Sequence, residues 1–242
     1  MLGTRITLGK KLKDEAEKPF WISFADLMTA LMVMFLLVMS VALLAVTKTV
    51  SEEQRAADAR KVAIEKLLDE VEQIAKNNPQ FSGIHVNRDS QTINFGDRAR
   101  FDTASHQLNL EQARLLRAYI PHVLAIADSD LGKDWLKRIV VEGFADKRGS
   151  YLLNLNLSLQ RSERVLCVLL AKADFSETEL SFGQREEIRQ LFLVGGYSSN
   201  SQKDTLEESR RIELRLEFRG IKELSRIANP TTEEDFGLCT LK

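Results

Sequence analysis

The sequence predicts an α+β protein in which a single N-terminal transmembrane helix leads through a helical linker to one globular domain. An uncharged apolar run begins after residue 26, a charged segment with apolar residues three and four apart follows, and short strand and helix patterns then alternate. Such patterns favour a small sheet with its helices on one face. We therefore divide the chain into a tail (1–20), a transmembrane helix (21–46), a linker (47–79), a domain (80–220) and a C-terminal tail (221–242).

Composition excludes several classes of function. The 242 residues carry a formal net charge of −1 with 29% charged residues, so the basic excess typical of nucleic-acid binding is missing. Two cysteines are too few for a disulfide scaffold, and His85, His106 and His122 form no metal-ligand motif. We expect no cofactor, no metal and no nucleic-acid partner.

The uncharged run is long enough to cross a membrane. Residues 27–46 contain no charge and only Thr29 and Ser40 as polar side chains. At about 1.5 Å per residue, such a helix covers the roughly 30 Å hydrocarbon core, and Phe20 and Trp21 stand where an aromatic belt would lie. A signal peptide, the alternative, has a shorter apolar region of about 7 to 15 residues. Five Lys or Arg precede Trp21 and five lie within 47–66, so charge bias does not fix the orientation.

The linker carries a narrow apolar stripe. Between residues 50 and 77 its members recur three and four apart among charged residues, as in an amphipathic helix: Ile64, Leu67, Leu68, Val71, Ile74 and Ala75. A narrow stripe suits pairing with a second copy better than burial in a core. We therefore expect a homodimer through this segment.

The remaining chain alternates between strands and helices. Strands are predicted at 91–95, 138–142, 191–195 and 211–218, and helices at 110–127 and 153–173. Residues 175–190 read as an insertion with a helical middle. Within 211–218, apolar residues alternate with charged ones, which is typical of a half-exposed strand.

Asp26 is the candidate functional residue of the membrane segment. An Asp at the centre of a membrane helix costs about 2.5 to 3.5 kcal/mol, and less near an end. Thr29, Ala30 and Val33 share its helical face and form a small strip able to pack on a partner helix. Two interpretations remain open on the chemistry alone: Asp26 reaches the headgroups as a structural residue, or it binds and releases an ion.

The segment from Pro19 to Thr29, PFWISFADLMT, resembles the signature of MotB-type stator subunits, W-x-x-x-[FY]-A-D-[LM]-[ML]-T. This resemblance implies that Asp26 is the ion-binding residue, with Thr29 and Ala30 beside the ion path. It also implies a MotA-like membrane partner in a 5:2 complex. We expect a transported proton, with sodium as the alternative.

A second resemblance covers about residues 91–218 and is to OmpA-type peptidoglycan-binding domains, which are βα sandwiches. The chain reads VEGFADKRGSYLLNLNLSLQR from Val141 to Arg161, where the family has V-x-G-[HY]-[TA]-D-x-x-G-[ST]-x-x-x-N-x-x-L-S-x-x-R. Phe101-Asp102 and the segment SRRIE at 209–213 support the match. Phe144 and Ser209 depart from the usual residues, and neither change removes a charge.

The OmpA-like resemblance implies a binding site for the diaminopimelate of peptidoglycan, whose side chain ends in an ammonium and a carboxylate. Asp146 is predicted to take the ammonium and Arg161 the carboxylate through its planar fork. Tyr151, Asn154 and Leu157 are predicted to shape the site. The alternative is an ordinary structural ion pair. Because the pattern holds no nucleophile or base, we expect binding without enzymatic activity.

Peptidoglycan lies outside the bacterial inner membrane, so the resemblance places the C-terminal domain in the periplasm and the N-terminus in the cytoplasm. The periplasm permits disulfides, and Cys167 could pair with Cys239 in the tail, with two unpaired thiols as the alternative.

The leading interpretation is a B-type subunit of an ion-driven inner-membrane rotary motor anchored to the wall. Its alternative from another class is a passive tether without ion conduction. Among stators, the overall pattern resembles the B subunits of Zorya anti-phage defence systems more than flagellar MotB, which implies a role in antiviral defence signalling.

Overall fold

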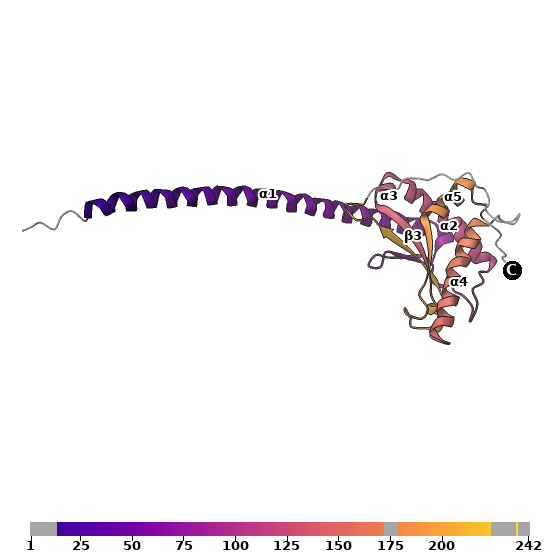
Figure 1. The fold of residues 1–242 in the computed structure, drawn as a ribbon. Coiled ribbons are helices and arrows are strands. Elements are labelled where there is room, and N and C mark those ends of the chain that lie inside the picture. Colours follow the sequence, from indigo (N-terminus) through magenta and orange to yellow (C-terminus); the bar gives the residue numbers. More distant parts are fainter. Residues whose placement is uncertain (1–13, 172–178, 224–235, 237–242) are drawn as a thin grey trace, which may run out of the picture. The chain divides into compact units, whose positions relative to one another are not determined.

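The computed structural model describes residues 14–171, 179–223 and Phe236. Contacts divide the chain into a first unit, which ends at Ala56, and a second unit, which begins at Ala57. Helix α1 (Asp14–Asn77) runs through both without interruption, so the predicted transmembrane helix and linker form one helix (Figure 1).

The first unit contains the part of α1 that is long and apolar enough to cross a membrane, with a mean hydropathy of 2.7 in its most apolar window. Every side chain from Trp21 to Val50 is exposed, and residues 27–46 carry no charge, so apolar side chains face outward on all sides of this run, as in a lipid-facing helix. Ser40 and Thr47 donate their hydroxyl hydrogens to carbonyl oxygens one turn earlier, at 2.7 Å each. Their polar groups are therefore satisfied within the helix.

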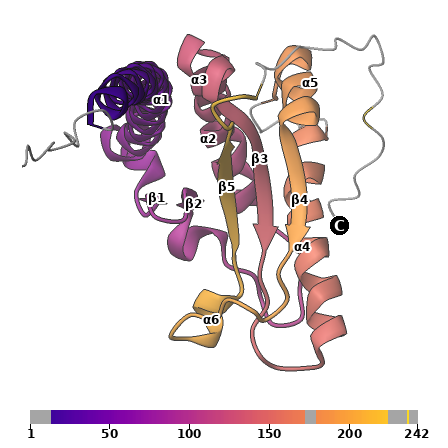
Figure 2. The same ribbon diagram turned by 60° about the vertical axis from the view of Figure 1, so that its left-hand side comes forward.

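The second unit contains a five-stranded mixed sheet in the order β1-β2-β5-β3-β4 (Figure 2). Its strands are β1 (His85–Asn87), β2 (Thr92–Asn94), β3 (Leu136–Gly143), β4 (Phe192–Gly196) and β5 (Ile212–Phe218). Neighbouring strands are antiparallel except β3 and β4, which are parallel. A parallel pair needs a crossover, and the helices between β3 and β4 supply it.

Helices α2 (Leu110–Asp128), α4 (Tyr151–Leu170) and α5 (Phe182–Leu191) cover one face of this sheet (Figure 2). Shorter elements are α3 (Asp130–Trp135), α6 (Leu206–Ser209), η1 (Pro79–Phe81) and η2 (Gly96–Ala99). Side chains that accept hydrogen bonds from the first turn begin α2, α4 and α5: Asn109, Ser150 and Ser181. The predicted α+β architecture is thus confirmed. The short β1 and α3 were not predicted.

The apolar stripe of the former linker is buried in its own domain, contrary to prediction. Leu67, Leu68 and Val71 are at most 2% exposed, and the stripe joins the core cluster with Phe81 and Tyr119. The Tyr119 hydroxyl lies 3.5 Å from the carbonyl oxygen of Val71. Because α2 and the chain after α1 present a complementary apolar surface, the stripe is buried without a second copy of the chain. The domain therefore begins near residue 57 rather than at residue 80.

Arg88, in the turn between β1 and β2, adds an electrostatic contact to the same segment. Its guanidinium pairs with Glu65, Asp69 and Glu72 on the exposed face of α1. These hydrogen bonds raise the pKa of Arg88 above its ordinary value. Because all four side chains are partly exposed, we assign this cluster a role in orientation more than in stability.

Candidate functional site

Asp26 lies in α1 at the start of the uncharged run. It is the only charged residue between Lys18 and Lys48. Thr29, one turn later, donates its hydroxyl hydrogen to the main-chain carbonyl oxygen of Asp26 at 2.8 Å. The hydroxyl hydrogen of Thr29 is therefore committed to the backbone, and the Ala30 side chain offers no polar group. Asp26, Thr29 and Ala30 lie within about one turn of each other in this helix, and the neighbouring turns contain no cation.

In the second unit, two glycines set the position of α4 above the carboxyl ends of β3 and β4. A Cβ atom on Gly143 would lie 2.0 Å from the Ser158 carbonyl oxygen, and one on Gly196 would lie 2.7 Å from the Ser158 hydroxyl oxygen. Only glycine permits this approach. It brings the first turns of α4 against the loop that follows β3, where the predicted wall-binding residues lie.

A cavity of about 330 Å³ opens at this junction. It is lined by Thr103 and Ala104, by the loop after β3, by the first three turns of α4 and by Arg210. Four of the five predicted residues border it: Asp146, Asn154, Leu157 and Arg161. Tyr151 is not among its lining residues. The Tyr151 side chain is exposed and its hydroxyl lies 3.4 Å from the Asn200 amide nitrogen.

Asp146 is the one carboxylate of the cavity and is 7% exposed. Its Oδ2 accepts hydrogen bonds from Arg148 Nη2 at 2.6 Å and Arg210 Nη1 at 3.2 Å. Its Oδ1 accepts one from the Arg148 main-chain N–H at 3.0 Å. These donors, Arg148 first, outweigh burial and lower the pKa of Asp146 to about 2. The carboxylate is therefore charged at neutral pH. Asn154 fixes the same loop by donating to the Asp146 carbonyl oxygen at 3.0 Å.

Arg161 lies deeper than the sequence indicated. It is 0% exposed and donates to three main-chain carbonyl oxygens: Phe144 at 2.6 Å, Ser105 at 2.9 Å and Asp102 at 3.2 Å. Burial and the nearby Arg210 lower its pKa to about 10. No ion pair joins it to Asp146 among the contacts of the described residues. The simple structural ion pair considered as the alternative is thus wrong, since the partners of Asp146 are Arg148 and Arg210.

Sequence reasoning missed Arg148 and Arg210 as members of the site. Arg210 stands in the segment SRRIE, which carried a signal, whereas Arg148 occupies a variable position of the pattern. The two differ in exposure: the Arg148 side chain is 51% exposed and the Arg210 side chain 9%. An exposed ion pair contributes only about 0 to 1 kcal/mol, whereas breaking a buried one costs about 3 to 5 kcal/mol. Arg148 is therefore the more easily displaced partner of Asp146.

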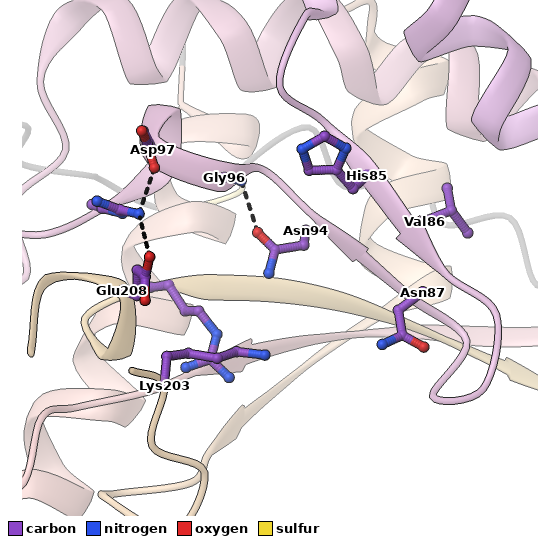
Figure 3. Close-up of a pocket in the computed structure, with 10 residues that line it drawn as sticks. His85, Val86, Asn87, Asn94, Gly96, Asp97, Lys203 and Glu208 are labelled. Atoms are coloured by element: carbon purple, nitrogen blue, oxygen red, sulfur yellow. Dashed lines mark hydrogen bonds and ion pairs between the residues drawn. The ribbon is translucent and has the colours of Figure 1, made fainter. Parts of the chain in front are cut away.

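A second cavity of about 660 Å³ lies beside β1, β2 and α6 and holds none of the predicted residues (Figure 3). Arg100 joins its two walls by pairing with Asp97 and with Glu208, the latter at 3.5 Å. Asn94 accepts a hydrogen bond from the Gly96 N–H at 2.7 Å. Arg100 is thus paired with both carboxylates of the lining, and we assign this cavity no function.

The remaining sequence predictions concern metals and the two cysteines. The described residues contain no group of three His, Cys, Asp or Glu able to hold a metal ion. Cys167 lies in α4, whereas Cys239 is outside the described residues, so their disulfide stays a prediction.

Comparison with known proteins identifies a family that matches the N-terminal part of the chain and a relative that matches most of its length. Residues 9–53 match the family described as membrane MotB of the proton-channel complex MotA/MotB. Over 223 residues the chain is 44% identical to the Zorya protein ZorB of Escherichia coli O139:H28 (strain E24377A / ETEC), covering 92% of this chain and 90% of that protein.

Two solved structures match about half of the chain each. The periplasmic domain of Helicobacter pylori MotB matches with 19% identity and a TM-score of 0.35, covering 53% of this chain and 81% of that one. The peptidoglycan-associated lipoprotein of Burkholderia pseudomallei matches with 16% identity and a TM-score of 0.33, covering 50% and 88% respectively.

Proposed function

Because this chain belongs to the family of the Zorya protein ZorB, we propose that it is the B-type subunit of a proton-driven inner-membrane motor that serves anti-phage defence. Its match to membrane MotB supports a MotB-type, stator-like subunit, and its described residues include one helix long and apolar enough to cross a membrane. In our proposal, protons pass Asp26, a MotA-like partner turns, and the second unit holds peptidoglycan.

The observation that carries the proposal is the isolated carboxyl group of Asp26. Residues one turn away on either side, Ile22, Ser23, Thr29 and Ala30, include no cation, and the Thr29 hydroxyl donates its hydrogen to the main chain and not to the carboxylate. Burial in an apolar environment favours the neutral form of a carboxyl group. A group that is neutral in lipid and charged when water reaches it can load and release a proton. Sodium is the alternative ion, for which the partner would have to supply further ligands.

The same carboxyl group supports a membrane partner. A carboxyl group at this depth requires compensation from outside its own helix, and a MotA-like subunit would supply it. We propose five such subunits around two copies of this chain. The buried linker stripe no longer supports the dimer, which now depends on the family resemblance alone.

The second unit is proposed to act as the anchor. Its cavity lies within the range of about 300 to 1,000 Å³ typical of ligand pockets, at its lower end. Asp146 is charged and lies at the cavity wall, where it can receive the ammonium group of diaminopimelate. Binding to the wall places this unit in the periplasm and the N-terminus in the cytoplasm.

The experiment is Asp26→Asn, with Asp58→Asn as the matched control outside the apolar run. Asp26→Asn should insert, assemble with its partner and bind sacculi like the wild type, yet lose protection against phage. Asp58→Asn should protect normally. Full protection by Asp26→Asn would favour the passive tether, which needs only the wall-binding cavity.

A further inference from the structure

Three hydroxyl groups are the only polar side-chain groups between residues 27 and 47, and they belong to Thr29, Ser40 and Thr47. Each donates its hydrogen to a main-chain carbonyl oxygen three or four residues earlier, at 2.7 or 2.8 Å. Because this bond removes much of the cost of a polar group in lipid, a membrane helix tolerates such a residue on any of its faces. The membrane alone therefore does not determine where on α1 these hydroxyl groups lie.

The three hydroxyl groups nevertheless lie along one line of the helix. They are 11 and 7 residues apart, close to three and two turns at 3.6 residues per turn. At about 100° per residue, all three fall within about 20° of one another and within about 60° of Asp26. At about 1.5 Å per residue, the distance from Asp26 to Thr47 along the axis is about 32 Å, which is close to the thickness of the hydrocarbon core. One face of α1 therefore carries the Asp26 carboxyl group and every hydroxyl group of this run.

Hydrogen bonding to the backbone leaves each of these hydroxyl groups as an acceptor. A hydroxyl group has one hydrogen to donate and two lone pairs that accept. In Thr29, Ser40 and Thr47 the hydrogen is committed, so an approaching molecule meets only the lone pairs of the oxygen. These side chains are exposed, so the described residues do not cover them. Oxygens that only accept suit a donor, such as a hydronium ion or a water molecule that relays a proton.

We propose that Ser40 and Thr47 extend the ion path from Asp26 through the membrane, as hydrogen-bond acceptors for the water that carries protons to its carboxylate. This inference rests on the proposed function and adds two residues to it. In the proposed orientation, the proton passes Thr47 first, then Ser40 about 10 Å further along the axis, and then Thr29 about 16 Å beyond. Water between this face and the MotA-like partner bridges these distances. The proton ends on the Asp26 carboxylate, and the water that delivered it is left neutral.

The test measures proton influx with a pH-sensitive fluorescent protein, in cells that produce the chain and its MotA-like partner during phage challenge. Ser40→Ala and Thr47→Val each remove one hydroxyl group and keep the apolar part of the side chain. Each should lower influx per assembled complex, counted by co-purification of the two subunits, by about two- to tenfold, as expected for one lost hydrogen bond. Ser40→Thr and Thr47→Ser keep the hydroxyl group and should retain the wild-type rate.

Thr49→Val is the matched control. The Thr49 hydroxyl group also donates to a carbonyl oxygen one turn earlier, that of Ala45 at 3.1 Å. At about 100° per residue, however, it lies about 140° from Asp26 and thus off the proposed path. Thr49→Val should therefore match the wild type, and an equal loss in this variant would overturn the assignment of the path to one face.

The dependence of influx on the pH of the medium separates a path residue from a packing residue. Without an acceptor on the way in, Ser40→Ala and Thr47→Val should need a more acidic medium to reach half of their maximal rate, and should approach the wild-type rate in the most acidic medium. A loss by the same factor at every pH would indicate altered packing and overturn the inference. Wild-type influx in both variants, with none in Asp26→Asn, would also overturn it and leave ion passage at Asp26 intact. Wild-type influx in Asp26→Asn would instead reject ion passage itself, and this inference with it.

Discussion

Leu68→Ala tests whether the end of α1 is part of the domain core. Leu68 is 1% exposed and belongs to the core cluster, whereas Val62 on the same helix is 67% exposed. Truncation of a buried leucine costs about 2 to 5 kcal/mol, because the lost transfer energy adds to that of the cavity left behind. We expect about 3 kcal/mol for Leu68→Ala. For Val62→Ala we expect at most about 0.5 kcal/mol.

The assay is urea unfolding of the full-length chain in micelles, followed by near-ultraviolet circular dichroism. With an m-value of about 2 kcal/mol/M, Leu68→Ala should lower the midpoint of the domain transition by about 1.5 M. Because the packing lies within one chain, this loss should be the same after tenfold dilution. Equal midpoints for the two variants would refute the packing we describe, and a loss that depends on protein concentration would restore pairing between copies.

Three further predictions concern the second unit. The pKa of Asp146 is about 2 when folded and about 3.9 when unfolded, so the stability it contributes, about 2.6 kcal/mol, should be present above about pH 4 and lost as the pH falls from about 4 to 2. The difference between the urea midpoints of the wild type and Asp146→Asn, measured as a function of pH, should shrink over this range. A difference that does not change with pH would contradict the prediction. Gly143→Ala should cost about 3 kcal/mol or more in thermal unfolding, because its Cβ would meet the Ser158 carbonyl oxygen, whereas Gly220→Ala, whose Cβ would lie 3.9 Å from Glu223 Cγ, should cost at most about 0.5 kcal/mol. Arg161→Ala should destabilise the domain by at least about 3 kcal/mol, since three buried or partly buried carbonyl oxygens lose their donor, and unchanged stability in the same assay would show that other donors replace it.

The long elements could be predicted because their periodicity depends on burial. The strand predicted at 211–218 appears as Ile212–Phe218, and the helix predicted at 110–127 appears as Leu110–Asp128. β1 spans three residues and α3 six, too few for a period to emerge. The linker stripe was assigned the wrong partner, because periodicity identifies the face that leaves water but not the surface that covers it.

The site could be predicted where motif spacing reflects geometry. Asp146, Asn154 and Arg161 line one cavity, as expected, because Gly143 and Gly196 let α4 pack closely against the ends of β3 and β4. The depth of Arg161 could not be predicted, because its partners are main-chain carbonyl groups and leave no trace in side-chain identity. Arg148 was missed because an exposed arginine in a loop resembles any solvated charge.

Ion passage at Asp26 is the central claim, and cytoplasmic pH measures it most directly. Cells that produce this chain with its MotA-like partner and a pH-sensitive fluorescent protein would be shifted to acidic medium during phage challenge. The wild type should acidify the cytoplasm faster than cells without the complex, Asp58→Asn should match it, and Asp26→Asn should fall to the rate of cells without the complex. Equal acidification by Asp26→Asn and wild type, at equal membrane levels, would contradict proton passage at this residue.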